Sequence, residues 1–120
     1  MKIEDAIHQT TFKSEGHKAM VNLLFTSGYF LGLINETTES FGITRQQYNV
    51  LRILRGQHPK AASINLIKER MLDRMSDSSR LVDRLVTKGL IKKSNCTADR
   101  RSVDVSITKK GLELLDRMEP

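Results

Sequence analysis

Residues 14–40 carry a long apolar pattern without a proline, which predicts a single long helix. Between Leu23 and Ile34 the apolar residues are more numerous than one core-facing stripe requires. We therefore expect this helix to bury surface against a second chain as well as against its own domain. Gly28 and Gly32 stand four residues apart, a spacing that permits two backbones to cross closely, although it is often accidental in a soluble helix.

The next segment contains start signals for shorter helices. Thr44 and Gln47 have the spacing of a capping box, and the helix that they begin is expected to run to about Arg55. Ser63 is a candidate N-cap for a short second helix. A turn near Leu72 then leads into a third helix, which gives the order helix, turn, helix.

The helix after this turn has two chemically different faces when its residues are spaced at about 100°. Its apolar face consists of Leu81, Val82, Leu85 and Val86. Its opposite face consists of Ser76, Arg80, Arg84 and Thr87. One face is expected to anchor the helix in the core, which leaves the other free to bind a partner. Gly89 is placed to end the helix in the left-handed conformation.

Two short strands are expected after this helix. Leu90–Lys93 precedes a polar loop, and Ser102–Ile107 alternates strictly between apolar and polar residues, as a half-buried strand does. Together they predict a β-hairpin wing. Thr108 then caps a final helix whose inward residues are expected to be Leu112, Leu115 and Met118. The pattern predicts one mainly helical α+β domain over residues 1–120, with a partner-binding lobe at 44–107 and a last helix at 108–120.

Composition adds a preference for polyanions. The 120 residues include 20 Lys and Arg against 14 Asp and Glu, which gives a formal net charge of +6 and a pI near 9.7. One cysteine cannot form an intramolecular disulfide or a cysteine zinc cluster, and the start MKIEDAIHQ lacks the apolar core of a signal peptide. We expect a cytoplasmic protein without a membrane segment. The sequence has no phosphate-binding glycine loop, paired nucleophile and base, or metal cluster, so we expect no enzyme activity, cofactor or metal.

The strongest candidate site is the two-faced helix together with the hairpin, because a cationic helix followed by a basic ribbon can bind a DNA groove and the adjacent backbone. The helix candidates are Ser76, Asp77, Ser79, Arg80 and Arg84. The hairpin candidates are Lys92, Asp99, Arg100 and Arg101. Arg45 and Ser63, at two helix starts, are candidate phosphate contacts.

Several of these residues have alternative interpretations. Arg80 and Arg84 could instead belong to a solvated face in which they pair with Asp77 and Asp83. Ser76 and Asp77 could serve only as helix caps, and the role of Asp77 toward DNA is open. Lys92 and Lys93 are neighbours on a strand, so only one of the two can face a duplex, and the sequence does not choose between them.

Cys96 lies near Lys92, Lys93 and Arg100, and these cations could lower the pKa of the thiol and make it an oxidation switch. The chain has no second cysteine to resolve a sulfenic acid. A redox role for Cys96 is therefore a secondary hypothesis.

Four strings in this order resemble the multiple-antibiotic-resistance regulator (MarR) family of bacterial winged helix-turn-helix transcription factors. They are RLVDRLV from Arg80, KGLI from Lys88, DRR from Asp99 and ITKKG from Ile107. The resemblance implies a homodimer that places two recognition helices in successive major grooves. It also implies that Asp99 braces a wing arginine, and that a small lipophilic ligand or cysteine oxidation regulates binding.

The sequence departs from the family pattern in two places. Family members usually carry another long helix after the one that begins at Thr108, so the dimer-forming C-terminal helix is expected to be truncated or absent here. Leu72 stands where glycine is frequent, and Ser78 stands where an apolar residue is common. The hypothesis is a homodimeric DNA-binding repressor released by a small ligand. The alternatives are a winged helix that binds protein without sequence-specific DNA binding, and a redox-sensing regulator that uses Cys96.

Overall fold

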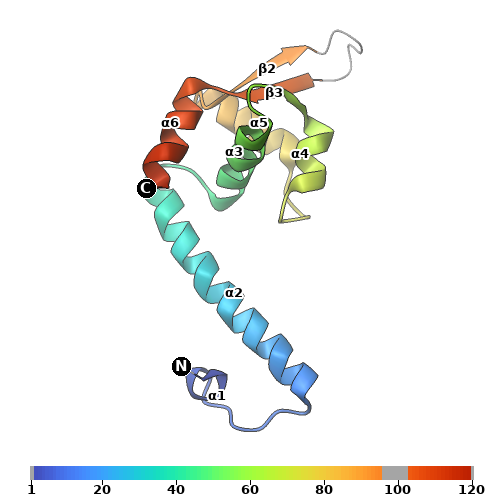
Figure 1. Cartoon of the computed structure of the whole chain (residues 1–120), viewed down its shortest axis with the longest axis vertical. Helices are drawn as coiled ribbons and strands as arrows, with labels where there is room; N and C mark the ends of the chain where they lie inside the picture. The colour runs from blue at the N-terminus through green and yellow to red at the C-terminus, as the bar shows by residue number, and fades with distance from the viewer. Residues whose placement is uncertain (1, 96–102, 120) are drawn as a thin grey trace. The chain divides into compact units, whose positions relative to one another are not determined.

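The computed structural model describes residues 2–95 and 103–119, and its contacts divide the chain into two compact units, residues 1–36 and 37–120. The first unit contains the short helix α1 (Ile3–Ala6) and most of α2 (Glu15–Ser40). An ion pair between Glu4 and Lys18 joins the two helices. The predicted long helix is confirmed (Figure 1).

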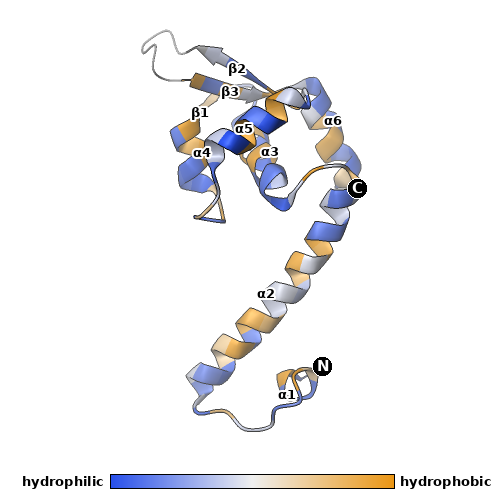
Figure 2. Cartoon of the chain, turned by 180° about the vertical axis from the view of Figure 1, so that it is seen from behind, coloured by the Kyte–Doolittle hydropathy of each residue, from blue (hydrophilic) through white to orange (hydrophobic). Residues whose placement is uncertain are grey.

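The middle of α2 is covered with exposed apolar side chains. Hydrophobic residues recur along its length (Figure 2). Those exposed by more than half are Met20, Leu23, Leu24, Tyr29 and Phe30. The surplus of apolar residues that the sequence shows is therefore not used within the chain. In the described ranges no helix has both the length and the hydrophobicity to span a bilayer.

The second unit, residues 37–120, is called the winged lobe below. Its helices are α3 (Arg45–Gln57), α4 (Ile64–Arg70), α5 (Ser78–Thr87) and α6 (Lys109–Met118). Its strands are β1 (Ala62–Ser63), β2 (Ile91–Asn95) and β3 (Val103–Ile107). The lobe is mainly helical with a small sheet, as predicted, and the helix-turn-helix order of α4 and α5 is followed directly by the β2–β3 hairpin (Figure 1).

The sheet has one strand more than the predicted hairpin. Its order is β1-β3-β2, and both pairings are antiparallel. Ile91 lies opposite Ile107 in the hairpin, while Ala62 lies opposite Val105 on the other edge of β3. Strand β1 is only two residues long and runs directly into α4, so it carries no alternation that a sequence pattern could reveal.

Short-range caps define the helix starts. The Thr44 hydroxyl accepts from the Gln47 amide and the Gln47 side chain accepts from the Thr44 amide, which confirms the capping box. Thr108 caps α6 in the same way by accepting from the Gly111 amide at 3.2 Å. At the end of α5, Gly89 has a φ of 75°, the left-handed conformation that the sequence predicted.

One continuous core holds the winged lobe together. Its buried side chains come from every helix and strand of the lobe, and those that are fully buried include Leu51, Ile67, Val82, Leu85, Val105 and Leu115. The prediction for α6 is confirmed for Leu115, which is buried, and for Leu112 and Met118, which are partly buried and pack against the core. Leu114, which the sequence did not single out, is buried as well. The buried stripe also includes Gly111, because the first turn of α6 packs against the Leu90 carbonyl and the Ile107 side chain.

Candidate nucleic-acid interface

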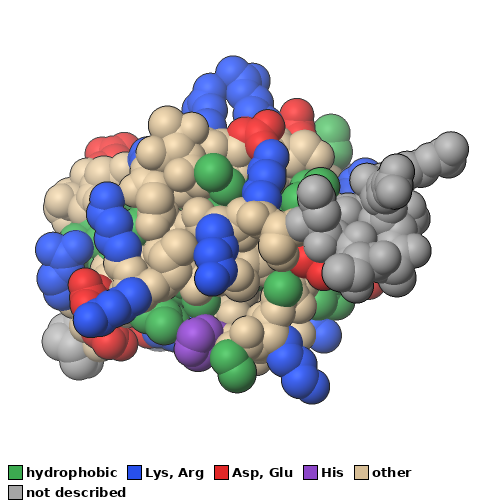
Figure 3. Space-filling view, turned by 90° about the horizontal axis from the view of Figure 1, so that it is seen from above, with side chains coloured by type: hydrophobic (Ala, Val, Ile, Leu, Met, Phe, Trp, Pro, Cys, Tyr) green, Lys and Arg blue, Asp and Glu red, His purple; other side chains and the backbone are tan. Residues whose placement is uncertain are grey.

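On the face of the molecule that Figure 3 shows, basic side chains are spread out rather than gathered in one cluster. Lys and Arg side chains are separated there by neutral surface, with acidic side chains among them. Charge alone therefore does not single out a binding site on this face. The site therefore has to be identified from the geometry of individual elements. Most of the candidate residues predicted from the sequence lie on α5 or directly before it.

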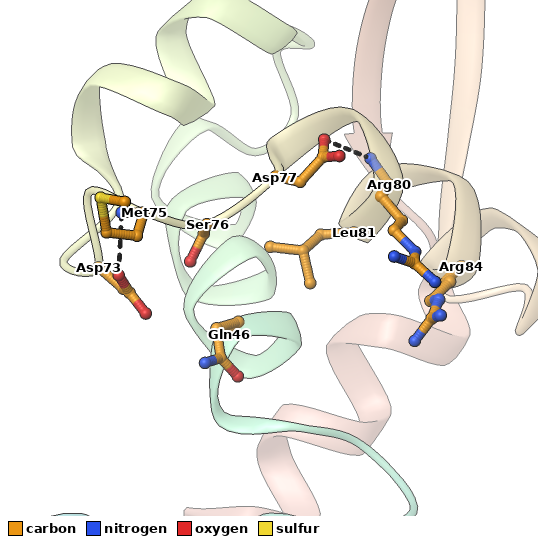
Figure 4. Close-up of a pocket in the computed structure, with 8 residues that line it drawn as sticks. All are labelled: Gln46, Asp73, Met75, Ser76, Asp77, Arg80, Leu81 and Arg84. Atoms are coloured by element: carbon orange, nitrogen blue, oxygen red, sulfur yellow. Dashed lines mark hydrogen bonds between the residues drawn. The ribbon is translucent and has the colours of Figure 1, made fainter.

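Helix α5 separates its anchoring residues from its outward residues as predicted. Val82 and Leu85 are fully buried in the core of the lobe. Arg80, Arg84 and Thr87 are exposed on the opposite side, which we call the outer face of α5. The two guanidinium groups extend side by side, one helical turn apart (Figure 4). This spacing suits two neighbouring phosphates or base edges.

The start of α5 lies two residues later than the candidate list implies. The first helical residue is Ser78, and the Asp77 carboxylate accepts from the Arg80 amide at 3.2 Å, so Asp77 is the N-cap. The placement of Ser76 and Asp77 in the first turn is therefore wrong, and the capping interpretation holds for Asp77. Ser79 does lie in the first turn, where it is exposed. Both residues can cap a helix, so the sequence could not tell which one does.

Two serine hydroxyls at this end of α5 lie below the surface. In the described part of the chain, the Oγ atoms of Ser76 and Ser78 are buried and have no hydrogen-bond partner. Ser78 is only 5% exposed, in agreement with the apolar character that the family favours at its position. Because Ser76 points inward, its hydroxyl is not part of the outer face of α5.

The arginines of the outer face are not neutralised by the carboxylates that the alternative interpretation proposed. Within residues 2–95 and 103–119, neither Arg80 nor Arg84 forms an ion pair. Asp83 pairs with Lys93 on β2, and Asp77 is engaged as a cap. The two guanidinium groups thus keep their donors for a partner.

A shallow groove of about 430 Å³ lies beside α5, between its first two turns, the turn before it and α3. It is lined by Gln46, Asp73, Met75, Ser76, Asp77, Arg80, Leu81 and Arg84. Figure 4 shows that Arg80 and Arg84 lie at one end and Asp73 and Met75 at the other, with Gln46 contributed by α3. The groove therefore combines two cationic side chains, an amide and apolar side chains with the carboxylates of Asp73 and Asp77.

Lys92 and Lys93 lie on opposite sides of β2. Lys93 pairs with Asp83 on α5, and it lies on the same side of β2 as the buried Ile91 because side chains alternate. Lys92 is exposed on the opposite side. The link between Lys93 and Asp83 joins the hairpin to α5. No sequence pattern indicates this link, because it depends on how β2 packs against α5.

Four of the remaining candidates lie outside the described residues: Cys96, Asp99, Arg100 and Arg101. The other two, Arg45 and Ser63, lie at helix starts. Arg45 is the first residue of α3 and is half-buried. The Ser63 hydroxyl accepts from the Leu66 amide at 3.1 Å, so its first role is to cap α4.

A polar contact joins the C-terminal end of α6 to α3. The Glu119 carboxylate accepts from Arg55 Nη1 at 2.6 Å and from the Tyr48 hydroxyl. The Arg55 guanidinium, followed by the Tyr48 hydroxyl, holds the pKa of Glu119 below its ordinary value. Burial, aided by the Glu119 charge, raises the pKa of Tyr48. The contact fixes where α6 ends against the lobe, and its members are too distant in sequence for a pattern to connect them.

The described residues contain no group of three or more His, Cys, Asp or Glu side chains that could hold a metal ion. The winged lobe has a helix-turn-helix, a β-hairpin beside its second helix and an exposed cationic face on that helix. These features define a winged helix-turn-helix protein.

Comparison with known proteins identifies the family. The sequence model of the MarR family matches residues 41–102. The HTH-type transcriptional regulator PapX of Escherichia coli is 30% identical over 87 residues, which cover 70% of this chain and 53% of PapX. The chain thus spans about half the length of PapX.

Solved structures agree with this assignment. A MarR transcription factor from Planctomyces limnophilus has a TM-score of 0.77 and 33% identity, covering 91% of this chain and 78% of its own. BpsR of Bordetella bronchiseptica, whose DNA binding is regulated by 6-hydroxynicotinic acid, has a TM-score of 0.64 and 27% identity, covering 82% of this chain and 75% of its own. The chain belongs to the MarR family of transcription regulators.

Proposed function

We propose that the chain is a cytoplasmic, homodimeric regulator that binds a near-palindromic duplex and acts as a repressor released by a small lipophilic ligand. The observation that carries DNA binding is the outer face of α5. It presents Arg80 and Arg84 one turn apart, exposed and without a carboxylate partner among the described residues. Two guanidinium groups held on a rigid helix match guanine edges and phosphates.

The exposed side of α2 supports the dimer. Leu23 is 71% exposed, and Phe30 and Ile34 lie on the same side of the helix as Leu23 because they follow it by seven and eleven residues. Soluble monomers rarely leave many large apolar side chains exposed next to one another. In the proposed dimer the two recognition helices lie about 34 Å apart, one turn of the duplex.

The experiment for DNA binding begins with a duplex selected by the wild-type protein from a random library. Its affinity is measured by fluorescence anisotropy as a function of salt. We expect Arg80→Ala to weaken binding by at least about fivefold, since one base contact contributes about 1–3 kcal/mol. The matched control is Arg117→Ala, which removes an equal charge from an exposed position on α6 outside the groove. It should change the affinity less than about twofold.

Salt dependence distinguishes this function from protein binding through the winged helix. A DNA complex held by several cations weakens steeply as salt rises, whereas an apolar protein interface does not. Selection that enriches no duplex, or equal losses for Arg80→Ala and Arg117→Ala, would contradict the proposed role of α5.

The dimer is tested separately by analytical ultracentrifugation. Leu23→Glu should shift the protein toward monomer, because it places a charge within the apolar side of α2. Thr10→Glu adds the same charge at an exposed position outside α2 and should leave the dimer intact. If both variants remain dimeric, α2 is not the dimer surface.

Ligand release is supported by the regulated DNA binding of BpsR. The test is titration of small aromatic acids, including 6-hydroxynicotinic acid, into the preformed complex with the selected duplex. Loss of anisotropy at constant salt is the expected result. If the complex persists with every compound, the proposed release of DNA by a small ligand is contradicted.

A further inference from the structure

Two apolar residues of the winged lobe are left in solvent. Among the described residues of the lobe, Leu72 and Met75 are the large hydrophobic side chains that remain exposed, by 84% and 92% respectively. Both lie on the turn between α4 and α5. The other exposed large hydrophobic side chains in the described ranges belong to α2, so this turn is a separate apolar feature.

The backbone of this turn is held by polar contacts. The Leu72 amide donates to the Asn49 side chain on α3 at 2.9 Å. The Asp73 carboxylate accepts from the Met75 amide at 3.0 Å, and the Asp73 carbonyl accepts from the Ser76 amide at 3.3 Å. Because these contacts fix the main chain on both sides of Met75, its side chain is presented outward by a defined turn.

Met75 and Leu72 differ in their position relative to the proposed interface. Met75 lines the groove along α5, at the end opposite Arg80 and Arg84 (Figure 4), whereas Leu72 does not line it. Met75 is thus an apolar side chain on the surface that also presents two guanidinium groups. In the major groove of DNA, the apolar group that such a side chain can contact is the 5-methyl group of thymine.

We propose that Met75 determines specificity by contacting the 5-methyl group of a thymine in each half-site. This inference rests on the proposed DNA-binding function. The position fits, because Met75 lies on the turn that comes two residues before the N-cap of α5, next to the end of a recognition helix that enters the groove. The side chain fits as well, since methionine is unbranched and polarizable and adapts to small apolar groups.

The experiment combines a protein substitution with a base substitution. In the duplex selected by the wild-type protein, each thymine is replaced in turn by uracil, which lacks only the methyl group. At one thymine of each half-site, uracil should weaken wild-type binding about fourfold, the factor expected for one buried methyl group. The same uracil should cause no further loss with Met75→Ala, because the two changes remove the same contact.

Leu72→Ala is the matched control, because it truncates a similarly exposed apolar side chain on the same turn. It should keep the full uracil effect. Thermal melting checks that neither variant unfolds the lobe. Equal uracil effects in the wild type and Met75→Ala, or no uracil effect in the wild type, would overturn the role of Met75 while DNA binding stands. Selection that enriches no duplex would instead overturn DNA binding and this inference together.

Discussion

Replacing Gly111 by alanine should destabilise the winged lobe even though alanine favours helices. Gly111 lies in the first turn of α6, and a Cβ added there would lie 2.3 Å from the Leu90 carbonyl oxygen and 2.7 Å from Cγ1 of Ile107. The Leu90 carbonyl cannot retreat freely, because it accepts from the Thr108 amide at 3.0 Å. The added methyl group must therefore move α6 away from the sheet.

The size of this effect follows from two opposing contributions. Forcing a methyl group into this contact costs about 2–3 kcal/mol, the upper part of the usual range for overpacking, while the helix preference of alanine over glycine returns about 1 kcal/mol. The net loss is about 1–2 kcal/mol in the free energy of unfolding. For a lobe of this size that corresponds to a fall of roughly 5–15 °C in Tm.

Gly56 provides the matched control for this measurement. It lies inside α3, which continues to Gln57, two residues past the predicted end at about Arg55, and a Cβ there would have no heavy atom within 4 Å. Gly56→Ala should therefore stabilise the lobe by about 0.5–1 kcal/mol. Thermal unfolding followed by circular dichroism compares the two variants. A Gly111→Ala protein that melts at or above the wild-type Tm would refute the packing argument.

Three further substitutions test other contacts. Asp77→Ala removes the N-cap of α5 and should cost about 1 kcal/mol in chemical unfolding, and no loss would show that the cap is dispensable. Ser78→Ala removes a buried hydroxyl without a described partner and should stabilise the lobe by about 1 kcal/mol in the same assay, whereas destabilisation would reveal an unrecognised hydrogen bond. The pKa of Glu119 lies below 4.5 in the folded lobe because of its bond to Arg55. The ion pair with Arg55 should therefore stabilise the folded lobe at neutral pH, by less than about 1 kcal/mol because the pair is partly exposed. This stabilisation is lost as the pH falls below about 4.5. Glu119→Gln should therefore be less stable than the wild type at neutral pH and equally stable in acid.

The helix boundaries could be predicted because the interactions that set them are short in sequence. Thr44 caps α3 through Gln47, and Thr108 caps α6 through Gly111, in both cases over three residues. Gly89 ends α5 with its own left-handed backbone. Residue types at fixed local spacing are sufficient to define such contacts, whatever the rest of the chain does.

The features that the sequence did not predict depend on elements that meet only after folding. Strand β1 exists because Ala62 pairs with Val105 of β3, far away in the chain. Lys93 reaches Asp83 only because β2 crosses α5, and Glu119 reaches Arg55 only because α6 returns to α3. A sequence pattern shows that these charges are present but does not show which of them become neighbours.

Part of the candidate site could be predicted from the sequence for the same reason as the helix boundaries. Arg80 and Arg84 could be placed on an exposed face because helical periodicity separates them from Val82 and Leu85. The apolar side chain of Met75 gave no such signal. Its exposure depends on the shape of the turn before α5, which periodicity does not describe.

The packing of α5 constrains how binding could be regulated in the proposed dimer. Val82 and Leu85 anchor the helix in the core, and the bond between Lys93 and Asp83 joins it to the hairpin. A ligand that reoriented Arg80 and Arg84 within one lobe would have to break these contacts. A ligand that changed only the separation of two intact lobes would leave them in place and still mismatch the spacing of successive major grooves. Regulation through the spacing of rigid lobes is therefore the energetically less costly route.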